Sequence, residues 1–334
     1  MPPGYIAPGV VSLGRQTAAI RTLLAQRRLP DTGWNEATVE IFLRQLSAMD
    51  ANNFAHVVGV GEREGRVVCG LVSRRHFGFA HGVGRGGDIS GAQPKAAGSS
   101  LLYRLTNLLA LDAVRTCGVP STAAALVLPC ATGLSLSIVL GAIRASRPDG
   151  AALVVVSRCD QRSALKAVVA AGCTPIVVPL RVVGDALCSD VGGIRQAIEQ
   201  GLGEARGPSS VVAVLTTTSC FAPREPDDVV AIGSLCAELD VPHVVNHAYG
   251  LQSKALCKLI NRACINNAGA QKPRNRASVT TDSLAVGISD ATASGAVAGN
   301  EKRQSRRRVD AIVSSTDKNF MVRLLRVLKY DVCV

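Results

Sequence analysis

The sequence has few aromatic residues and no long apolar run. Aromatic residues make up 3% of its 334 residues while it contains 32 glycines, so Ala, Val and Leu side chains must fill most of any core. No run of 18 or more apolar residues occurs, which excludes a membrane-spanning helix. The amino-terminal stretch MPPGYIAPGVVSLGRQ lacks a basic start followed by an apolar segment, so we expect no secretory signal. We therefore expect a cytoplasmic protein that does not act at a membrane.

The sequence also lacks the cysteine and histidine spacings of a metal site. Its 11 cysteines are scattered along the chain, and no HExxH motif accompanies them. An odd number of unclustered cysteines in a long chain indicates free, mostly buried thiols. We therefore expect no metal ligands.

The composition suits a folded protein with a polyanionic partner. A hydrophobic content of 47% excludes wholesale disorder, and the length fits one large α/β domain with an added amino-terminal piece. The formal net charge is +12, which suits a nucleic acid or another polyanion as a partner.

From Ser99 onward, short apolar segments alternate with helix-length segments. The expected strands are Ala124–Leu128, Leu153–Val156, Pro175–Val178, Val211–Leu215, His243–Val245 and Ala311–Val313. Continuously apolar strands separated by helices are typical of a mostly parallel sheet covered by helices on both faces. Ligands of such sheets bind at the carboxyl ends of the strands.

Two segments lie outside this alternation. Leu13–Arg28 and Glu36–Met49 have apolar residues on one face and predict amphipathic helices, which would either make subunit contacts or cover the core. Residues 266–308 are rich in small and basic residues with little apolar content, which predicts a disordered or mobile surface loop.

The last expected strand leads to a single lysine. The apolar run Ala311–Val313 gives way to small hydroxyl residues and then to Lys318. A partly desolvated amine on a rigid element can act as a Schiff-base lysine. The alternative is a lysine that points into water at the end of a strand.

Two other strand ends carry residues that suit a cofactor. Ala131, Thr132 and Gly133 open a helix, so their N–H groups and a hydroxyl can bind a phosphate. Asn246 ends a strand and can offer one hydrogen bond to a ring nitrogen.

Two glycine-rich loops precede the alternating part. The glycines of HGVGRGG match GxGxxG, but no buried strand precedes them and no helix opens directly after them, so the dinucleotide-binding context fails. The loop carries Arg85, Gln93 and Lys95 and either wraps a phosphate or is a disordered linker. The loop Gly59–Arg66 is either a solvated turn or holds an arginine toward an anion.

Several of these stretches together resemble one family. The motifs are GVGEREGRV, HGVGRGGDISGAQPKAAGSSLL, ATGLSL, TTSCFAPR, PHVVNHAYGLQS and STDKNFMV. Their order and sequence resemble the O-phosphoseryl-tRNA(Sec) selenium transferases (SepSecS, the soluble liver antigen family), which are fold-type I pyridoxal-phosphate enzymes.

The resemblance implies a function in selenocysteine biosynthesis. Family members eliminate phosphate from O-phosphoseryl-tRNA(Sec), which leaves dehydroalanyl-tRNA, and selenophosphate then supplies selenium to give selenocysteinyl-tRNA(Sec). The implied cofactor is pyridoxal 5'-phosphate, the implied partners are tRNA(Sec) and selenophosphate, and the implied assembly is a cytoplasmic homotetramer.

The resemblance also implies roles for individual residues. Lys318 matches the catalytic lysine, and Asn246 matches the asparagine that faces the pyridine nitrogen. The cofactor-binding set is Arg63, Ala131, Thr132, Gly133, Gln161, Asn246 and Lys318. The substrate-binding set is Glu62, Gly84, Arg85, Gly86 and Gln93, in which Gly86 stands where the family has a serine.

The chain departs from the family after its last motif. Arg323–Val334 does not follow the family pattern, so we expect the small carboxyl-terminal domain to be absent. The expected organisation is a helical oligomerisation segment (1–58), a large transferase domain (59–322, with the insertion at 266–308) and a divergent tail (323–334). Two alternatives stay open, a non-catalytic remnant that binds tRNA or oligomerises, and another tRNA-dependent pyridoxal enzyme such as one that delivers sulfur.

Overall fold

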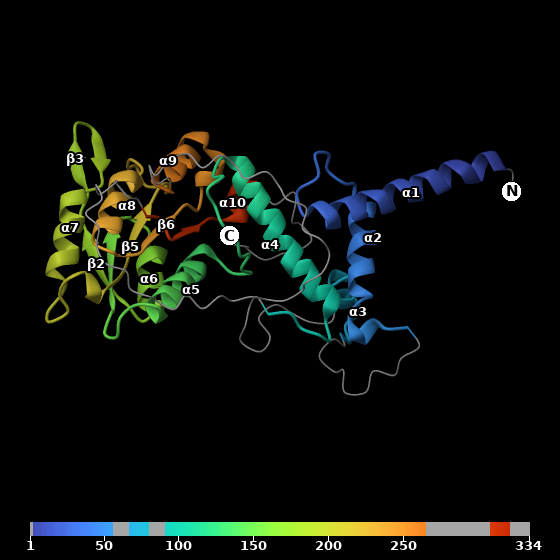
Figure 1. Ribbon diagram of the computed structural model, residues 1–334, viewed down its shortest axis with the longest axis horizontal. Coiled ribbons are helices and arrows are strands. Elements are labelled where there is room, and N and C mark those ends of the chain that lie inside the picture. The colour runs from blue at the N-terminus through green and yellow to red at the C-terminus, as the bar shows by residue number, and fades with distance from the viewer. Residues whose placement is uncertain (1–2, 56–66, 80–90, 265–307, 321–334) are drawn as a thin grey trace, which may run out of the picture.

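A helical amino-terminal part is joined to a helix-covered sheet in the computed structural model (Figure 1). The structure describes residues 3–55, 67–79, 91–264 and 308–320. The predicted insertion, the tail and the two loops at 56–66 and 80–90 therefore lie wholly or mostly outside the described residues.

The main sheet has the strand order β2-β1-β5-β6-β7, and every neighbouring pair in it is parallel. Its strands are β1 Leu153–Ser157, β2 Thr174–Val178, β5 Val211–Thr217, β6 His243–Asn246 and β7 Ala311–Val313. Every residue of β1, β5 and β6 is buried, as expected for strands covered on both faces. The prediction of an α/β fold with a mostly parallel sheet is confirmed.

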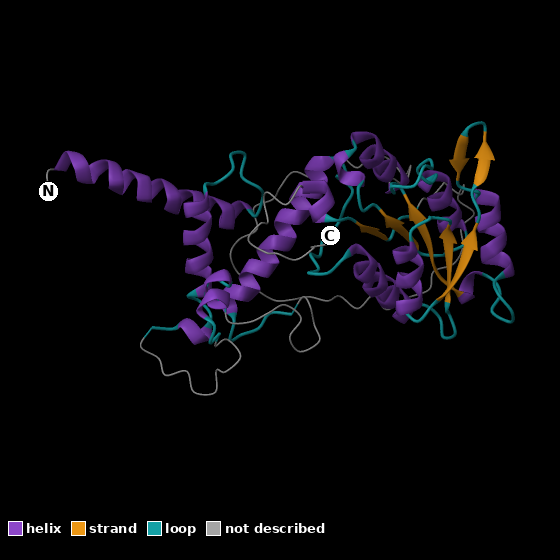
Figure 2. Cartoon of the chain, turned by 180° about the vertical axis from the view of Figure 1, so that it is seen from behind, coloured by secondary structure: helices purple, strands orange, loops and turns teal. Residues whose placement is uncertain are grey.

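Helices cover both faces of this sheet (Figure 2). The helices of this part are α5 Thr132–Ala145, α6 Arg162–Ala170, α7 Val191–Gln200, α8 Val229–Glu238, α9 Lys254–Cys264 and α10 Thr316–Phe320, with short 3-10 turns at Pro208–Ser210 and Gly250–Gln252 (η4). Val154 and Val156 pack with α5 and α6, whereas Leu153 and Val155 pack with α7 and α8. Alternate residues of β1 thus enter opposite cores, because successive side chains of a strand point to opposite faces.

The amino-terminal part is helical, as predicted. It contains α1 Pro3–Gln26, α2 Glu36–Ser47, a 3-10 turn at Ala51–Asn53, α3 Gly70–Arg75 and α4 Ala97–Cys117. Ile20, Leu23, Phe42, Leu46 and Leu105 form a small core between α1, α2 and α4. Figure 1 shows α4 running from this core to the sheet, with α1 projecting away from the rest of the molecule.

Two expectations about the elements were wrong or incomplete. Ala124–Leu128 is not a strand of the sheet, apart from an isolated bridge at Leu128. Its backbone bonds to α4 instead, because Asn107 Oδ1 accepts from Val127 N (2.8 Å) and the Tyr103 hydroxyl donates to Val127 O (2.9 Å). The sequence analysis also missed an antiparallel hairpin of β3 Arg181–Val183 and β4 Ala186–Cys188.

The described residues contain neither a membrane-spanning helix nor a cluster of metal ligands. None of the helices there is both long enough and apolar enough to cross a membrane. Within the same ranges, no group of three or more His, Cys, Asp or Glu side chains is placed to hold a metal ion. The cysteines in these ranges are free, and most of them are buried or half-buried.

Candidate active site

The backbone brings Asn246 and the segment that carries Lys318 to the same edge of the sheet. Asn246 is the last residue of β6 and pairs in register with Val313, the last residue of β7. The turn that follows is held against β6, since His247 N donates to Val313 O (2.8 Å) and Ser314 Oγ donates to His247 O (3.3 Å). Lys318 lies in α10 immediately after this turn, in a one-turn helix rather than at the strand end that the sequence suggested.

Lys318 is half-buried and lies beside an aromatic ring. Its Nζ lies 5.1 Å from the centroid of the Tyr249 ring, within the range of a cation–π interaction. Gln252 Nε2 donates to Lys318 O, and Asn319 Nδ2 donates to Ala248 O (2.9 Å). These bonds fix α10 against the segment that follows β6, so the backbone of Lys318 is held in a defined position.

Asn246 is only 3% exposed, and one end of its side chain is engaged. Its Oδ1 accepts a hydrogen bond from Ala248 N (3.3 Å). A ligand atom bound by this side chain would therefore accept a hydrogen bond from Nδ2. An unprotonated ring nitrogen is an acceptor of this kind.

Polar atoms without partners lie next to Asn246. His247 is fully buried, and its Nδ1 is 2.7 Å from Thr218 Oγ1 at the end of β5. Among the described residues, neither His247 Nε2 nor Ser219 Oγ has a hydrogen-bond partner, although both atoms are buried. Buried polar atoms are nearly always satisfied in folded proteins, so this edge of the sheet fits a polar ligand.

The His247 ring is neutral and tightly packed. Burial lowers the pKa of His247 to about 4. A Cβ added to Gly250 would lie within 2.5 Å of three atoms of the ring, closer than real Cβ contacts. Only glycine fits at this position while the histidine keeps its place.

A buried ion pair that the sequence analysis did not single out connects two loops of this edge. Asp227 Oδ1 accepts from Ser157 Oγ (2.6 Å), Oδ2 accepts from Thr217 N (2.7 Å), and the carboxylate pairs with Arg224. Burial raises the pKa of Asp227, while Arg224 and the hydrogen bonds oppose that rise. Arg224 also donates to Arg158 O, so this pair ties the loop after β1 to the loop after β5.

The amino ends of α5 and α6 lie side by side near this network. Ala131 and Gln161, the residues that precede these helices, make no side-chain capping bond, unlike Asp190 before α7. Gly133 lies against Ser163, with 3.5 Å between its Cβ position and Ser163 Cβ. Paired helix amino ends favour an anion such as phosphate, so the predicted phosphate site at Ala131, Thr132 and Gly133 has a consistent setting.

Gln93 lies just before α4, where Ser100 Oγ accepts from Gln93 N (2.8 Å). Further along α4, Tyr103 and Asn107 contact Val127, in the segment that leads to Ala131. Glu62, Arg63, Gly84, Arg85 and Gly86 lie outside the described residues.

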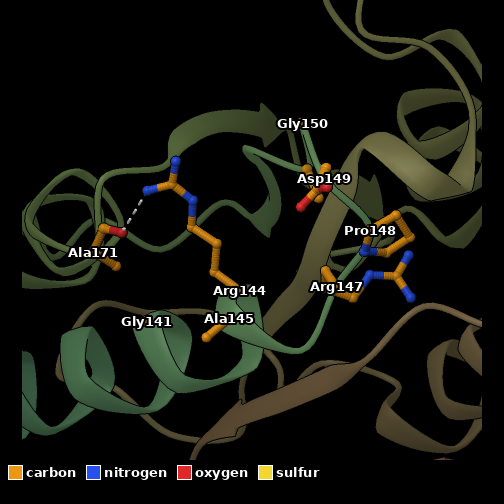
Figure 3. A pocket seen from close by; sticks show the side chains of 9 residues that line it. Gly141, Arg144, Ala145, Arg147, Pro148, Asp149, Gly150 and Ala171 are labelled. Carbon is orange, nitrogen blue, oxygen red and sulfur yellow. Dashed lines mark hydrogen bonds between the residues drawn. The ribbon is translucent and has the colours of Figure 1, made fainter.

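A shallow cavity of about 420 Å³ lies at the opposite, amino edge of the sheet (Figure 3). Arg144, Arg147, Pro148 and Asp149 at the end of α5 line part of it. None of the predicted site residues lines this cavity, and ligands of parallel sheets bind at the other edge. It is therefore not the candidate active site.

Comparisons with known proteins agree with the motifs. A family model described as O-phosphoseryl-tRNA(Sec) selenium transferase, SepSecS, matches residues 49–269. The crystal structure of an archaeal O-phosphoseryl-tRNA(Sec) selenium transferase matches with a TM-score of 0.76 and 26% identity, covering 100% of this chain and 64% of that chain.

Curated relatives carry the same description. The proteins from Dictyostelium discoideum, Caenorhabditis elegans and Methanopyrus kandleri are 37%, 40% and 34% identical and align with 95%, 91% and 96% of this chain. The chain spans 57%, 54% and 62% of their respective lengths. These matches confirm the resemblance drawn from the motifs, and the structural match confirms the predicted fold class.

Proposed function

The chain belongs to the O-phosphoseryl-tRNA(Sec) selenium transferase family, and on this premise we propose that it converts O-phosphoseryl-tRNA(Sec) to selenocysteinyl-tRNA(Sec) with selenophosphate. The observation that carries the proposal is the register of Asn246 with Val313, which sets the asparagine and the Lys318 helix at one sheet edge. Beside them lie buried polar atoms that have no partner among the described residues.

The residues present fit pyridoxal 5'-phosphate. The amino end of α5, at Ala131, Thr132 and Gly133, suits the phosphate, with Gln161 at the adjoining helix end. Asn246 Nδ2 suits the ring nitrogen, and the Lys318 amine suits the aldehyde. When bound, the cofactor supplies an electron sink for a carbanion at the substrate α-carbon.

The chain's own groups have distinct tasks in this proposal. Lys318 Nζ holds the cofactor and is the base that takes up the substrate α-proton. Arg85 and Gln93 bind the leaving phosphate, and Arg85 stabilises the charge that grows on it. Arg63 binds the cofactor side, while Glu62, Gly84 and Gly86 line the substrate site.

The amino-terminal helices support an oligomeric assembly. Exposed apolar side chains on α1 offer a surface for subunit contact, namely those of Tyr5, Ile6, Val10, Val11 and Leu13. We propose a cytoplasmic homotetramer that binds tRNA(Sec) with its basic surface.

Cofactor attachment gives the direct test. Protein purified with pyridoxal phosphate should show the absorbance band of the lysine-bound cofactor, and borohydride should bleach the band and fix the cofactor to the peptide that contains Lys318. Lys318→Ala should lose the band, whereas Lys254→Ala, a change at an exposed lysine of α9, should keep it.

Two results would contradict the assignment. An unchanged spectrum in Lys318→Ala would place the attachment elsewhere, as would a reduced cofactor on another lysine peptide. Protein that binds tRNA(Sec) without ever taking up the cofactor would favour a non-catalytic remnant of the family. Turnover with a sulfur donor but not with selenophosphate would favour a sulfur-delivering enzyme.

A further inference from the structure

Two cysteines that are distant in the sequence, Cys159 and Cys220, meet at the carboxyl edge of the sheet. Cys159 follows the end of β1, and Cys220 follows the end of β5. These strands are adjacent, parallel and in register, with Val156 opposite Leu215. The two thiols are close enough to interact electrostatically, and the Thr217 side chain also interacts with Cys159.

Interactions on both sides hold the two cysteine loops together. Ser157 Oγ bonds to Asp227 Oδ1 at 2.6 Å, and Arg224 bonds to both Asp227 and Arg158 O. Neighbouring strands lie ~4.8 Å apart, and the Cα atoms of a disulfide lie ~4.4–6.8 Å apart. Loops that leave adjacent strands and are tied together in this way can bring two cysteines within the span of a disulfide.

The two thiols differ in their access to solvent. Cys159 is 8% exposed, and burial together with the neighbouring Cys220 thiol raises the pKa of Cys159 to about 11. Cys220 is half-buried, and its thiol donates to Ala222 O (3.4 Å). A reagent from solvent thus reaches Cys220 first, while Cys159 stands behind it as a shielded second thiol.

We propose that Cys159 and Cys220 are a reversible modification site, a dithiol that hydroperoxides convert to a disulfide between the loop after β1 and the loop after β5. The Cys220 thiolate attacks the peroxide oxygen, which gives a sulfenic acid and, for hydrogen peroxide, releases one water after proton uptake. Cys159 sulfur then attacks the sulfenic sulfur, forms the S–S bond and expels a second water. The two sulfurs together lose two electrons, the peroxide gains them, and a dithiol reductant reverses the change.

The disulfide would act on the sheet edge that carries the candidate active site. Gln161 follows Cys159 in the same loop and precedes α6, beside the amino end of α5. Linking the loops fixes the backbone around Gln161. The modification itself involves only the two thiols and a peroxide, so it does not depend on the proposed function.

Peptide mapping of the peroxide-treated full chain tests the proposal. Protein is exposed to hydrogen peroxide and then denatured, the remaining thiols are alkylated, and the digest is analysed by mass spectrometry without reduction. The expected result is a cross-linked peptide pair containing Cys159 and Cys220, with two fewer alkylated cysteines, both restored by dithiothreitol. Cys69 is exposed and reports, by trapping of its sulfenic acid, that peroxide has reached the protein.

Single variants distinguish Cys220, the thiol that peroxide oxidises first, from Cys159, the thiol that then forms the disulfide. Cys159→Ser should leave Cys220 as a trappable sulfenic acid, and Cys220→Ser should leave Cys159 fully alkylatable. Cys130→Ser, a change at a half-buried thiol that bonds to Ser135 Oγ before α5, should leave the cross-link unchanged. The proposal is overturned if Cys159 and Cys220 stay alkylatable after Cys69 has been oxidised, or if either cysteine pairs with a different one.

Discussion

Two buried histidines stand at the two ends of β6, and hydrogen-bond chemistry fixes the proton of the first. His243 Nδ1 is 2.9 Å from Arg308 O, and a carbonyl can only accept, so Nδ1 carries the proton. Its Nε2, 2.8 Å from Thr216 Oγ1, must then accept from the hydroxyl. Burial lowers the pKa of His243 to about 4, as it does for His247, so both rings are neutral in the folded protein.

These two histidines should make the folded state sensitive to acid. Their pKa is lowered from 6.5 to about 4 on folding, so between these pH values the unfolded chain binds protons that the folded chain does not. Stability is unaffected above pH 6.5 and is lost as pH falls toward 4. From pH 7 to pH 5 we expect each histidine to lower the free energy of unfolding by about 2 kcal/mol.

Urea unfolding at the two pH values measures this loss. His247→Asn should remove about half of the histidine contribution, whereas His76→Asn, at an exposed histidine, should leave the loss as it is in the parent. The interpretation fails if His247→Asn loses as much stability on acidification as the parent protein does.

The sequence predicted the candidate site residues that follow strand ends. It did not predict pairs of side chains that lie in different loops and come into contact. The apolar run before Asn246 marked it as a strand-end residue, which β6 confirms, whereas Lys318 lies in α10 beyond the end of β7. Asp227 and Ser157, and likewise Cys159 and Cys220, meet because two loops pack together. No periodicity records such packing, so a pass along one sequence could not find these pairs.

The contact between α2 and α4 depends on a glycine. A Cβ added to Gly98 would lie 1.7 Å from Leu46 O, a backbone atom that cannot move without shifting α2. Asp50, fully buried just after α2, accepts from Ser99 N (2.9 Å) and Ser99 Oγ (2.6 Å) at the start of α4. A carboxylate at a helix amino end is favourable, so the close approach and the cap reinforce each other.

Gly98→Ala should therefore loosen the amino-terminal helices. We expect a loss of about 1–3 kcal/mol, the usual range for overpacking, despite the better helix propensity of alanine. Gly141→Ala is the matched control, since nothing lies within 4 Å of the added Cβ in α5, and it should gain about 0.5–1 kcal/mol.

The protein's single tryptophan reports this change. Trp34 packs edge-on against Phe42 with 5.8 Å between ring centroids, in the same small core as α2 and α4. Its fluorescence should show an earlier unfolding midpoint in Gly98→Ala and a later one in Gly141→Ala. Equal midpoints in both variants would show that α2 and α4 do not approach this closely.

The prediction of strands succeeded for most of the apolar runs. It failed where side chains of a helix, rather than a neighbouring strand, bond to the backbone of the run. Five of the expected strands formed. Every residue is buried in the three central strands, β1, β5 and β6, while β2 and β7 form the edges of the sheet. Ala124–Leu128 has the same apolar character, but Asn107 and Tyr103 of α4 take its backbone bonds. The hairpin of β3 and β4 could have been predicted from Gly184-Asp185, a dipeptide typical of tight hairpin turns. Gly184 adopts a φ of 61° there.

On the scale of the whole molecule, Arg147 joins three distant segments at the amino edge of the sheet. Its guanidinium donates to Val211 O (3.0 Å), Pro208 O (2.7 Å) and Asp240 O (3.0 Å). It thereby ties the end of α5 to the start of β5 and to the turn after α8. Lysine cannot reproduce this fan of donors.

Arg147→Lys should lower the free energy of unfolding by about 2–3 kcal/mol, because charged-group hydrogen bonds are lost while buried carbonyls stay in place. Arg144→Lys is the control, since Arg144 in the same cavity wall makes one long bond, 3.4 Å to Ala171 O (Figure 3). It should change stability by less than about 0.5 kcal/mol. Denaturant unfolding followed by circular dichroism compares the two variants, and equal losses would contradict a bridging role for Arg147.

The pairing of β6 with β7 has a consequence for synthesis on the ribosome. β6 ends at Asn246 and β7 begins at Ala311, so the 64 residues 247–310 must be made between them. At roughly 5–20 residues per second, synthesis of this segment takes about 3–13 s. During that time the edge of β6 that will pair with β7 has no partner strand. Nascent chains should therefore need protection from aggregation in this interval, and Lys318 can join Asn246 only after residues 247–310 have been made.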